Sequence, residues 1–390
     1  MKLQREKNPL VVLNGILIDG STAEGIVTIP NTVTRISRSA FQGNANITEV
    51  TIPESVTSID LAAFNVCTGL KKVTISGSIT NINSYTFSGC KSLEKIVIPD
   101  GVTEIGMDAF AGCTSLNEVV IPDSVKKIWS EAFSNCTSLK EVKIPDGVTE
   151  IALETFKGCT SLKKITIPQS VTSIGSAAFS GTQWLKDKQA QDTLVIVNNI
   201  LIDGSTAQGK IVIPDGVTEI VSSAFEAGTE LVEVIMPESL KKIGANAFIN
   251  CTKLEKVILP AGVEEFGSEY DQSFVSLGIA YNVFNNCLEE NNYKWEPNTK
   301  VNLYVPEGSH PYDYVKAAGL TYTVIPTIKD YTGLKKVGDY WFMYEKGNVT
   351  FSYDGLAKNG NTWWYVNNSM IDFTYSGLCK YNGSWWYVKN

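Results

Sequence analysis

The stretch "FKGCTSLKKITIP", residues 156–168, reveals the architecture because the chain repeats it with few changes. Related stretches stand at 87–99, 110–122 and 133–145, and each begins with Phe, has Cys as its fourth residue and ends in Ile-Pro. The prolines of this series are always 23 or 46 residues apart, and Ser76 fills a slot where a proline is missing. A fixed period of this length indicates a solenoid. The prolines are Pro30, Pro53, Pro99, Pro122, Pro145, Pro168, Pro214, Pro237, Pro260 and Pro306.

Each period contains two short extended segments and a turn. Residues 116–122 ("LNEVVIP") have the alternating pattern of a strand that its proline ends, and residues 102–105 ("VTEI") form a shorter one. Residues 106–113 make a turn too short for an α-helix, which carries Phe110 inward. No period closes a core of its own, so burial requires neighbours stacked about 4.8 Å apart. We predict a parallel β-solenoid with a spine of stacked Phe residues: Phe41, Phe64, Phe87, Phe110, Phe133, Phe156, Phe179, Phe225 and Phe248.

A cysteine recurs once in most periods, which limits what these thiols can do. A zinc site needs four ligands that converge on one point, whereas these residues lie along a line. Disulfide bonds between adjacent periods stay open as an alternative, because about 4.8 Å is an allowed separation, although parallel Cβ directions fit the S–S torsion poorly. We expect free, buried thiols that pack as small apolar groups. They are Cys67, Cys90, Cys113, Cys136 and Cys159, and Cys379 stands outside the array.

The period V-x-x-I-x-x-x-A-F-x-x-C-x-x-L-x-x-V-x-I-P, as at 102–122, resembles the leucine-rich repeats of the Treponema pallidum type found in BspA-like bacterial surface proteins. The resemblance covers roughly residues 10–326. It implies a curved leucine-rich-repeat solenoid, mostly β with short helical turns, whose parallel sheet lies on the concave face. It also implies a secreted or cell-surface protein that binds other proteins or host surfaces.

Two related segments interrupt the simple repeat. Leu10–Pro30 aligns without gaps on Leu194–Pro214, and two thirds of the aligned positions are identical. We expect a hairpin insert in each (10–30 and 194–214), the second turned at Asp203-Gly204 and preceded by a short helix. Because the N-terminal segment recurs inside the chain, it is a structural unit and not a signal peptide. We therefore expect the chain to start inside a longer protein, with any export signal missing.

The last part of the array predicts a closing unit. Insertions interrupt the period between Pro260 and Pro306, and residues 305–326 follow with a helix expected near 311–318. Solenoids need atypical terminal units, so we interpret this segment as a cap. The predicted domains are a solenoid over 1–327 and a second region over 328–390.

The second region repeats with a different, slightly shorter period, at 333–354, 355–376 and 377–390, and is rich in aromatic residues. Each unit predicts a β-hairpin. The strings Gly355…Trp363-Trp364-Tyr365 and Gly377…Trp385-Trp386-Tyr387 are similar to cell-wall-binding repeats that include choline-binding and glucan-binding modules.

In that family, aromatic side chains hold a choline headgroup or stack on sugar rings. The choline-binding versions often carry Trp after the leading Gly, where this chain has Leu334, Leu356 and Leu378. Choline, glucan or another wall polymer therefore all stay open as the ligand. The resemblance implies these wall-binding residues: Trp341, Tyr344, Trp363, Trp364, Tyr365, Trp385, Trp386 and Tyr387.

The outward positions of the predicted strands could bind a protein partner. An alternative is a solvated ladder of mixed charges with Lys–Glu pairs between periods, since no aromatic anchor occurs among them. We name the candidate partner-binding residues the strand face: Lys72, Lys95, Glu118, Glu141, Lys143 and Lys164.

Composition excludes several classes of function. With 33 basic and 41 acidic residues and a net charge of −8, the chain has no basic patch for nucleic acid. No apolar stretch is long enough to span a membrane. The chain has a single histidine, His310, which argues against a mechanism with a histidine base and against a His-rich metal site. We expect no catalytic residue, metal or cofactor.

We expect a non-enzymatic, extracellular or surface-bound adhesion protein, held non-covalently on the cell wall by its C-terminal repeats. The alternative is a targeting or carbohydrate-binding fragment of a larger secreted enzyme.

Overall fold

The computed structural model describes residues 9–267, 283, 285–287, 295–297, 300–350, 355–359, 362–367, 370–371, 377–381 and 384–388. For 285–287, 295–297 and the segments after 354, the description covers the backbone. The chain divides into two compact units, Met1–Asp192 and Thr193–Asn390.

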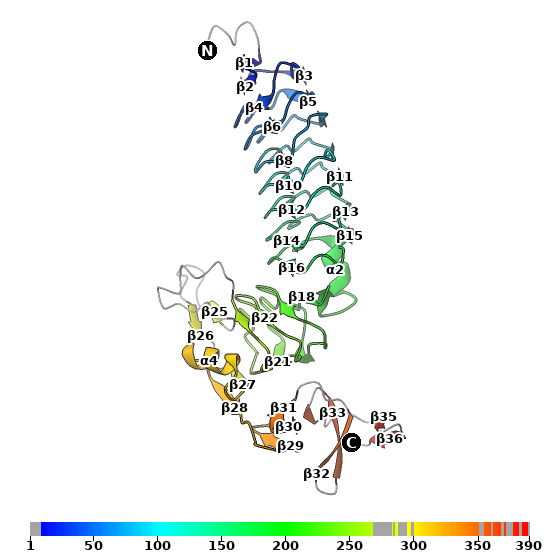
Figure 1. Ribbon diagram of the computed structural model, residues 1–390, viewed down its shortest axis with the longest axis vertical. Helices are drawn as coiled ribbons and strands as arrows, with labels where there is room; N and C mark the ends of the chain where they lie inside the picture. Colours follow the sequence, from blue (N-terminus) through cyan, green and yellow to red (C-terminus); the bar gives the residue numbers. More distant parts are fainter. Residues whose placement is uncertain are drawn as a thin grey trace. The chain divides into compact units, whose positions relative to one another are not determined.

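Unit 1 is a stack of repeated turns, here called rungs, whose strands form two columns (Figure 1). Most strands pair in parallel with the equivalent strand of the next rung, as Glu104 does with Lys127, so the predicted solenoid is confirmed. The first column contains β3 (Gly25–Thr28), β5 (Ile47–Ile52), β7 (Lys72–Ile75), β9 (Lys95–Val97), β11 (Glu118–Val120), β13 (Glu141–Lys143) and β15 (Lys164–Thr166). The second contains β4 (Arg35–Ile36), β6 (Ser58–Ile59), β8 (Asn81–Ile82), β10 (Glu104–Ile105), β12 (Lys127–Ile128), β14 (Glu150–Ile151) and β16 (Ser173–Ile174).

A hairpin and a helix mark the ends of this stack. The hairpin consists of β1 (Val11–Leu13) and β2 (Ile16–Asp19), and β2 also pairs in parallel with β4, which continues the second column. The predicted short helix is α2 (Gln183–Gln189). Thr182, which replaces the repeated cysteine, accepts a hydrogen bond from the Leu185 N–H at 3.1 Å and so caps this helix.

The Phe residues stack along the inside of unit 1. Ring centroids of successive residues from Phe41 to Phe179 lie 4.8 to 6.1 Å apart, with ring planes within 12° of parallel. From Phe41 to Phe156, each backbone N–H also donates to the next rung, as Phe110 does to the Ala132 carbonyl at 2.8 Å. In unit 2, Phe225 and Phe248 stack in the same way at 4.8 Å. Because a side chain of this size contributes roughly 2 kcal/mol when buried, the spine is a main stabilising element of each unit.

The turn before each Phe adopts an unfavourable backbone conformation that was not predicted from the sequence. The residue two positions before the Phe has a left-handed φ of 53° to 61°, although few residues other than Gly or Asn favour it. At Glu131, the N–H donates to the Leu153 carbonyl of the next rung at 2.9 Å, and equivalent bonds recur along the stack. These bonds between rungs hold the strained backbone in place. The residues are Ser39, Ala62, Tyr85, Asp108, Glu131, Glu154, Ala177, Ser223 and Asn246.

Unit 2 begins with a second hairpin and has two columns of strands of its own. One sheet contains β17 (Val195–Val197), β18 (Ile200–Asp203), β20 (Glu219–Ile220), β22 (Lys242–Ile243) and β24 (Glu265–Phe266). The other contains β19 (Gly209–Val212), β21 (Leu231–Ile235), β23 (Lys256–Ile258), β27 (Asn302–Pro306) and β28 (Tyr322–Ile325). The expected helix is α4 (His310–Ala317). The insertions before it lie largely outside the described residues, apart from the paired strands β25 (Asn285–Cys287) and β26 (Trp295–Pro297).

The predicted position of the second hairpin turn was wrong. The turn is made by Asn198 and Asn199, whose φ angles of 48° and 66° are those of a two-residue hairpin turn. Asp203 instead ends β18, and its carboxylate accepts a hydrogen bond from the Ser205 N–H at 3.2 Å. Asp19 does the same with the Ser21 N–H at 2.9 Å, as expected for Asp in a turn.

The C-terminal repeats form hairpins, as predicted. The antiparallel pairs are β29 (Gly333–Val337) with β30 (Tyr340–Glu345), β32 (Gly355–Asn359) with β33 (Thr362–Asn367), and β35 (Gly377–Tyr381) with β36 (Ser384–Val388). The short strand β34 (Met370–Ile371) pairs with both β30 and β33 and joins the first two hairpins, while β31 (Asn348–Val349) pairs with β30.

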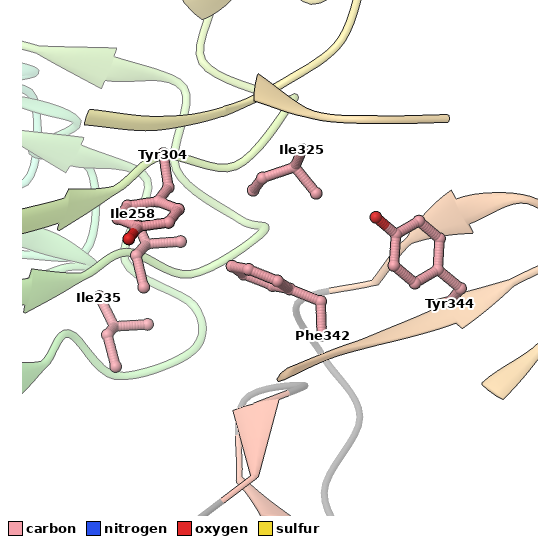
Figure 2. Close-up of a cluster of buried hydrophobic side chains, with 6 residues drawn as sticks. All are labelled: Ile235, Ile258, Tyr304, Ile325, Phe342 and Tyr344. Carbon is pink, nitrogen blue, oxygen red and sulfur yellow. The ribbon is translucent and has the colours of Figure 1, made fainter. Parts of the chain in front are cut away.

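The first hairpin packs against the end of the solenoid in unit 2. Phe342 and Tyr344 of β30 join side chains from β21, β23, β27 and β28 in one apolar cluster (Figure 2). No member of this cluster is more than 2% exposed. The first aromatic repeat is therefore part of a core shared with the solenoid. We call these residues the docking cluster: Ile235, Ile258, Tyr304, Ile325, Phe342 and Tyr344.

Candidate functional site

The cysteines of the rungs are packing groups in this structure. Six described cysteines are free and buried, and each thiol donates to the carbonyl of a Phe in the preceding rung, as Cys159 does to Phe133 at 3.1 Å. Burial raises the pKa of Cys113 to about 12, and that of Cys251 likewise, so these thiols stay protonated at neutral pH. Among the described residues, no group of three or more His, Cys, Asp or Glu side chains could hold a metal. Cys379 has no described side chain.

Replacing Cys159 by alanine is expected to cost about 1 kcal/mol of unfolding free energy, because a small buried group and one weak hydrogen bond are lost. Urea denaturation measures this cost, and binding to partners should be unchanged. Cys136→Ala is the matched control, since its thiol makes the same bond to Phe110. Loss of binding by a Cys159→Ala variant that remains folded would instead show that this thiol acts chemically.

The strand face lies on the first column of unit 1. Its six residues are all exposed, and they stand on β7, β9, β11, β13 and β15. The Lys95 ammonium lies 2.6 Å from the Glu118 carboxylate, and the Lys164 ammonium lies 2.6 Å from that of Glu141. Exposed pairs of this kind contribute roughly 0 to 1 kcal/mol. Lys–Glu pairs between rungs therefore exist, and partner binding by these residues stays a prediction.

The predicted wall-binding residues fall into two groups. In the first repeat, Trp341 is partly exposed, whereas Tyr344 is 0% exposed and belongs to the docking cluster. Tyr344 is thus a core residue in this structure and has no surface for a polymer. The other six stand on β33 and β36, where the backbone alone is described: Trp363, Trp364, Tyr365, Trp385, Trp386 and Tyr387.

Polar contacts surround the docking cluster. Lys256 of β23 donates to the carboxylate of Asp339, in the turn between β29 and β30, at 2.8 Å. This hydrogen bond raises the pKa of Lys256 and lowers that of Asp339. The ring of Tyr340 meets that of Tyr304 edge-on at 4.8 Å. The sequence did not predict this contact, because the aromatic period alone does not show which face of a hairpin is buried.

Two family models match the chain. The model for the BspA type leucine rich repeat region matches residues 22–140, 80–208 and 203–300, in six copies. The chain belongs to the BspA-type leucine-rich-repeat family. The model for the choline-binding repeat matches residues 352–372 and 374–390, which contain the second and third hairpins.

Solved structures of leucine-rich-repeat proteins are similar to this chain. One from T. pallidum shares 34% identity, with 43% of this chain and 81% of that chain covered and a TM-score of 0.41. One from Bacteroides ovatus shares 24% identity over 80% of this chain and 94% of that chain, with a TM-score of 0.41. A leucine rich cell surface protein from Faecalibacterium prausnitzii shares 24% identity over 78% and 79%, also with a TM-score of 0.41.

Among curated proteins, none matches the chain significantly. Within the described part of the chain, no helix is long and apolar enough to cross a membrane. The family and the solenoid fold point to a binding or structural protein, and the choline-binding repeats point to association with a cell wall.

Proposed function

We propose that this protein acts at the bacterial cell surface, where its C-terminal repeats hold it on a wall polymer and its solenoid binds a protein or host-surface partner. The observation that carries the proposal is the combination of two matches in one chain: BspA-type repeats over 22–300 and choline-binding repeats over 352–390. When one region attaches a protein to a surface, the linked binding region is held there at a high effective concentration for its partner.

The chemistry of wall attachment would come from the second and third hairpins. Trp, Trp and Tyr are consecutive at 363–365 and again at 385–387. Aromatic faces attract a quaternary ammonium through cation–π contacts, which suits choline on a wall polymer. The first hairpin has a different role in this proposal, because Phe342 and Tyr344 of its β30 are buried in the docking cluster.

The solenoid would offer the strand face to its partner. Parallel pairing of β9 with β11 and of β13 with β15 places outward side chains of neighbouring rungs opposite one another in a row. A rigid row of this kind suits a large, flat protein surface. The mixture of Lys and Glu in the row favours a partner with complementary charges.

The structure shows where a truncation should fall. Ending the chain at Pro326 would expose the docking cluster, so the informative variant ends at Thr350 and keeps β29, β30 and β31. We expect the full chain to sediment with purified choline-containing cell walls and residues 1–350 to stay largely in the supernatant. Both proteins should show the same thermal unfolding of the solenoid.

Two controls separate the alternatives. Free choline at millimolar concentration should release the full chain if choline is the ligand, whereas walls stripped of choline should still bind it if a glycan is. Equal sedimentation of the full chain and of residues 1–350 would contradict wall attachment by the C-terminal repeats. As a second readout, residues 1–350 should bind host surface proteins saturably, and a Lys143→Glu, Lys164→Glu variant should bind less.

A further inference from the structure

One rung of unit 1 lacks the proline that ends the strand in its neighbours. Ser76 occupies this slot, and its N–H donates to the Ile52 carbonyl of the preceding rung at 2.9 Å. A proline has no N–H and could not make this bond. The next residue, Gly77, lies so close to the preceding rung that a Cβ atom would come within 2.4 Å of the Val56 carbonyl oxygen. The Ser76-Gly77 pair therefore draws the end of β7 toward β5.

The strand on the other side of β7 pairs with it less extensively. β7 pairs with β5 over four residue pairs, but with β9 only at Lys72 and Lys95. One rung later, β9 pairs with β11 over three residue pairs. There the Ile98 N–H donates to the Val120 carbonyl of the following rung at 3.3 Å. The equivalent residue of β7, Ile75, instead pairs back with Ile52. The sheet thus separates between β7 and β9 beyond their first residue pair.

A cleft of about 480 Å³ occupies this separation. Its apolar lining comes from Val73, Ile75, Val97 and Pro99. Thr74, three lysines and one acidic residue complete the lining; the charged residues are Lys71, Lys72, Lys95 and Glu94. The cleft therefore combines an apolar lining with an excess of positive charge.

Two of these lysines stand at opposite positions of the paired strands. Lys72 and Lys95 are direct partners in the pairing register, and both are exposed. Like charges in this arrangement repel each other. Lys95 is paired on its far side with Glu118 of β11, whereas Lys72 makes no salt bridge within the described part of the chain. An anion bound in the cleft would supply a partner for the Lys72 ammonium.

We propose that this cleft binds a small organic anion that has an apolar body, such as a carboxylate joined to a branched or aromatic group. The volume is in the range of small-molecule sites, whose walls are mostly apolar with a few polar groups that orient the ligand. The aliphatic lining buries the body, and the lysines bind the carboxylate. This site goes beyond the proposed function, because it takes a small molecule and not a protein, and it shares Lys72 and Lys95 with the strand face.

The test uses the full chain with labelled methyl groups and N-acetyl-phenylalanine as the probe. Methyl signals of Val73, Ile75 and Val97 should shift saturably with a dissociation constant of roughly 1 mM, as expected for a small ligand in an open site. The amide of the same compound, which has no carboxylate, should bind at least about tenfold more weakly. Equal binding of acid and amide would contradict the role of the lysines.

Three variants test the site itself. Ser76→Pro removes the backward hydrogen bond, and we expect it to restore pairing with β9 and abolish binding. Val97→Glu places a carboxylate in the cleft and should also abolish binding, whereas Thr166→Glu, at the equivalent position of β15, should not. Lys72→Gln should weaken binding about fivefold and Lys143→Gln should leave it unchanged.

If Ser76→Pro does not fold, Val97→Glu still tests the site. Val97 is 54% exposed, so its replacement should not prevent folding. Absence of saturable shifts in the unmodified chain would overturn the proposal. So would binding that is unchanged by both Val97→Glu and Lys72→Gln. Retained binding by a folded Ser76→Pro variant would show that the Ser76 hydrogen bond does not shape the cleft.

Discussion

Replacing Phe133 by alanine is expected to lower the free energy of unfolding by about 3 to 5 kcal/mol. Phe133 is 0% exposed, and its ring stacks between those of Phe110 and Phe156 at 5.3 and 5.6 Å. The Cys159 thiol also donates to its carbonyl. Because the surrounding rungs are tied to one another by backbone hydrogen bonds, they should not collapse into the cavity that remains. Urea denaturation followed by circular dichroism measures the loss.

Because Phe133 lies in the middle of the stack, its loss should also destabilise the neighbouring rungs. In a solenoid each rung contacts only its neighbours, so one cavity weakens the interfaces on both sides. Hydrogen exchange should therefore accelerate first in the rungs next to Phe133. Val120→Ala is the matched control, because Val120 is 45% exposed on the neighbouring rung and should cost less than about 0.5 kcal/mol. A similar loss for both variants would show that the Phe spine does not carry the stability.

Replacing Phe342 by alanine is expected to release the first hairpin from the solenoid. Phe342 is 0% exposed and lies in the docking cluster, with its ring centroid 6.4 Å from that of Tyr304. Phe→Ala at a buried site costs about 3 to 5 kcal/mol, and a two-stranded hairpin is marginally stable by itself. Limited proteolysis should then cut between 326 and 350 much faster than in the unmodified chain, while the solenoid remains intact.

Tyr344→Phe provides the contrasting variant in the same cluster. The Tyr344 hydroxyl is buried and makes no hydrogen bond in the described structure, and burial raises its pKa to about 12. Removing an unsatisfied buried hydroxyl should leave the stability unchanged or raise it slightly. If Phe342→Ala were as resistant to protease as Tyr344→Phe, the docking cluster would not be what holds the hairpin.

Much of the fold follows from spacing in the sequence. The fixed step between prolines predicted parallel pairing, and the recurring Phe and Cys predicted which side chains are inside. Phe110 and Cys113 are both 0% exposed, as expected for residues that every rung repeats. Periodicity is informative here because equivalent residues occupy equivalent packing positions in every rung.

Local turns were predicted less well. The hairpin turn was predicted at Asp203-Gly204 but lies at Asn198-Asn199. Both pairs of residues favour turns, and only the strand register distinguishes them. Among the proposed wall-binding residues, Tyr344 proved to be buried. The period of the C-terminal repeats identifies aromatic positions, but it does not show which of them contact the solenoid.

Sequence alone was enough to predict the solenoid, its regular step, its Phe spine and the buried role of its cysteines. Three further features emerged only from the folded chain: the left-handed turns at residues such as Glu131, the docking of the first hairpin through Phe342, and the cleft beside Ser76. The reason is the same for all three. Each depends on hydrogen bonds or contacts between separate segments, and their free energy outweighs the local preference of the residues involved.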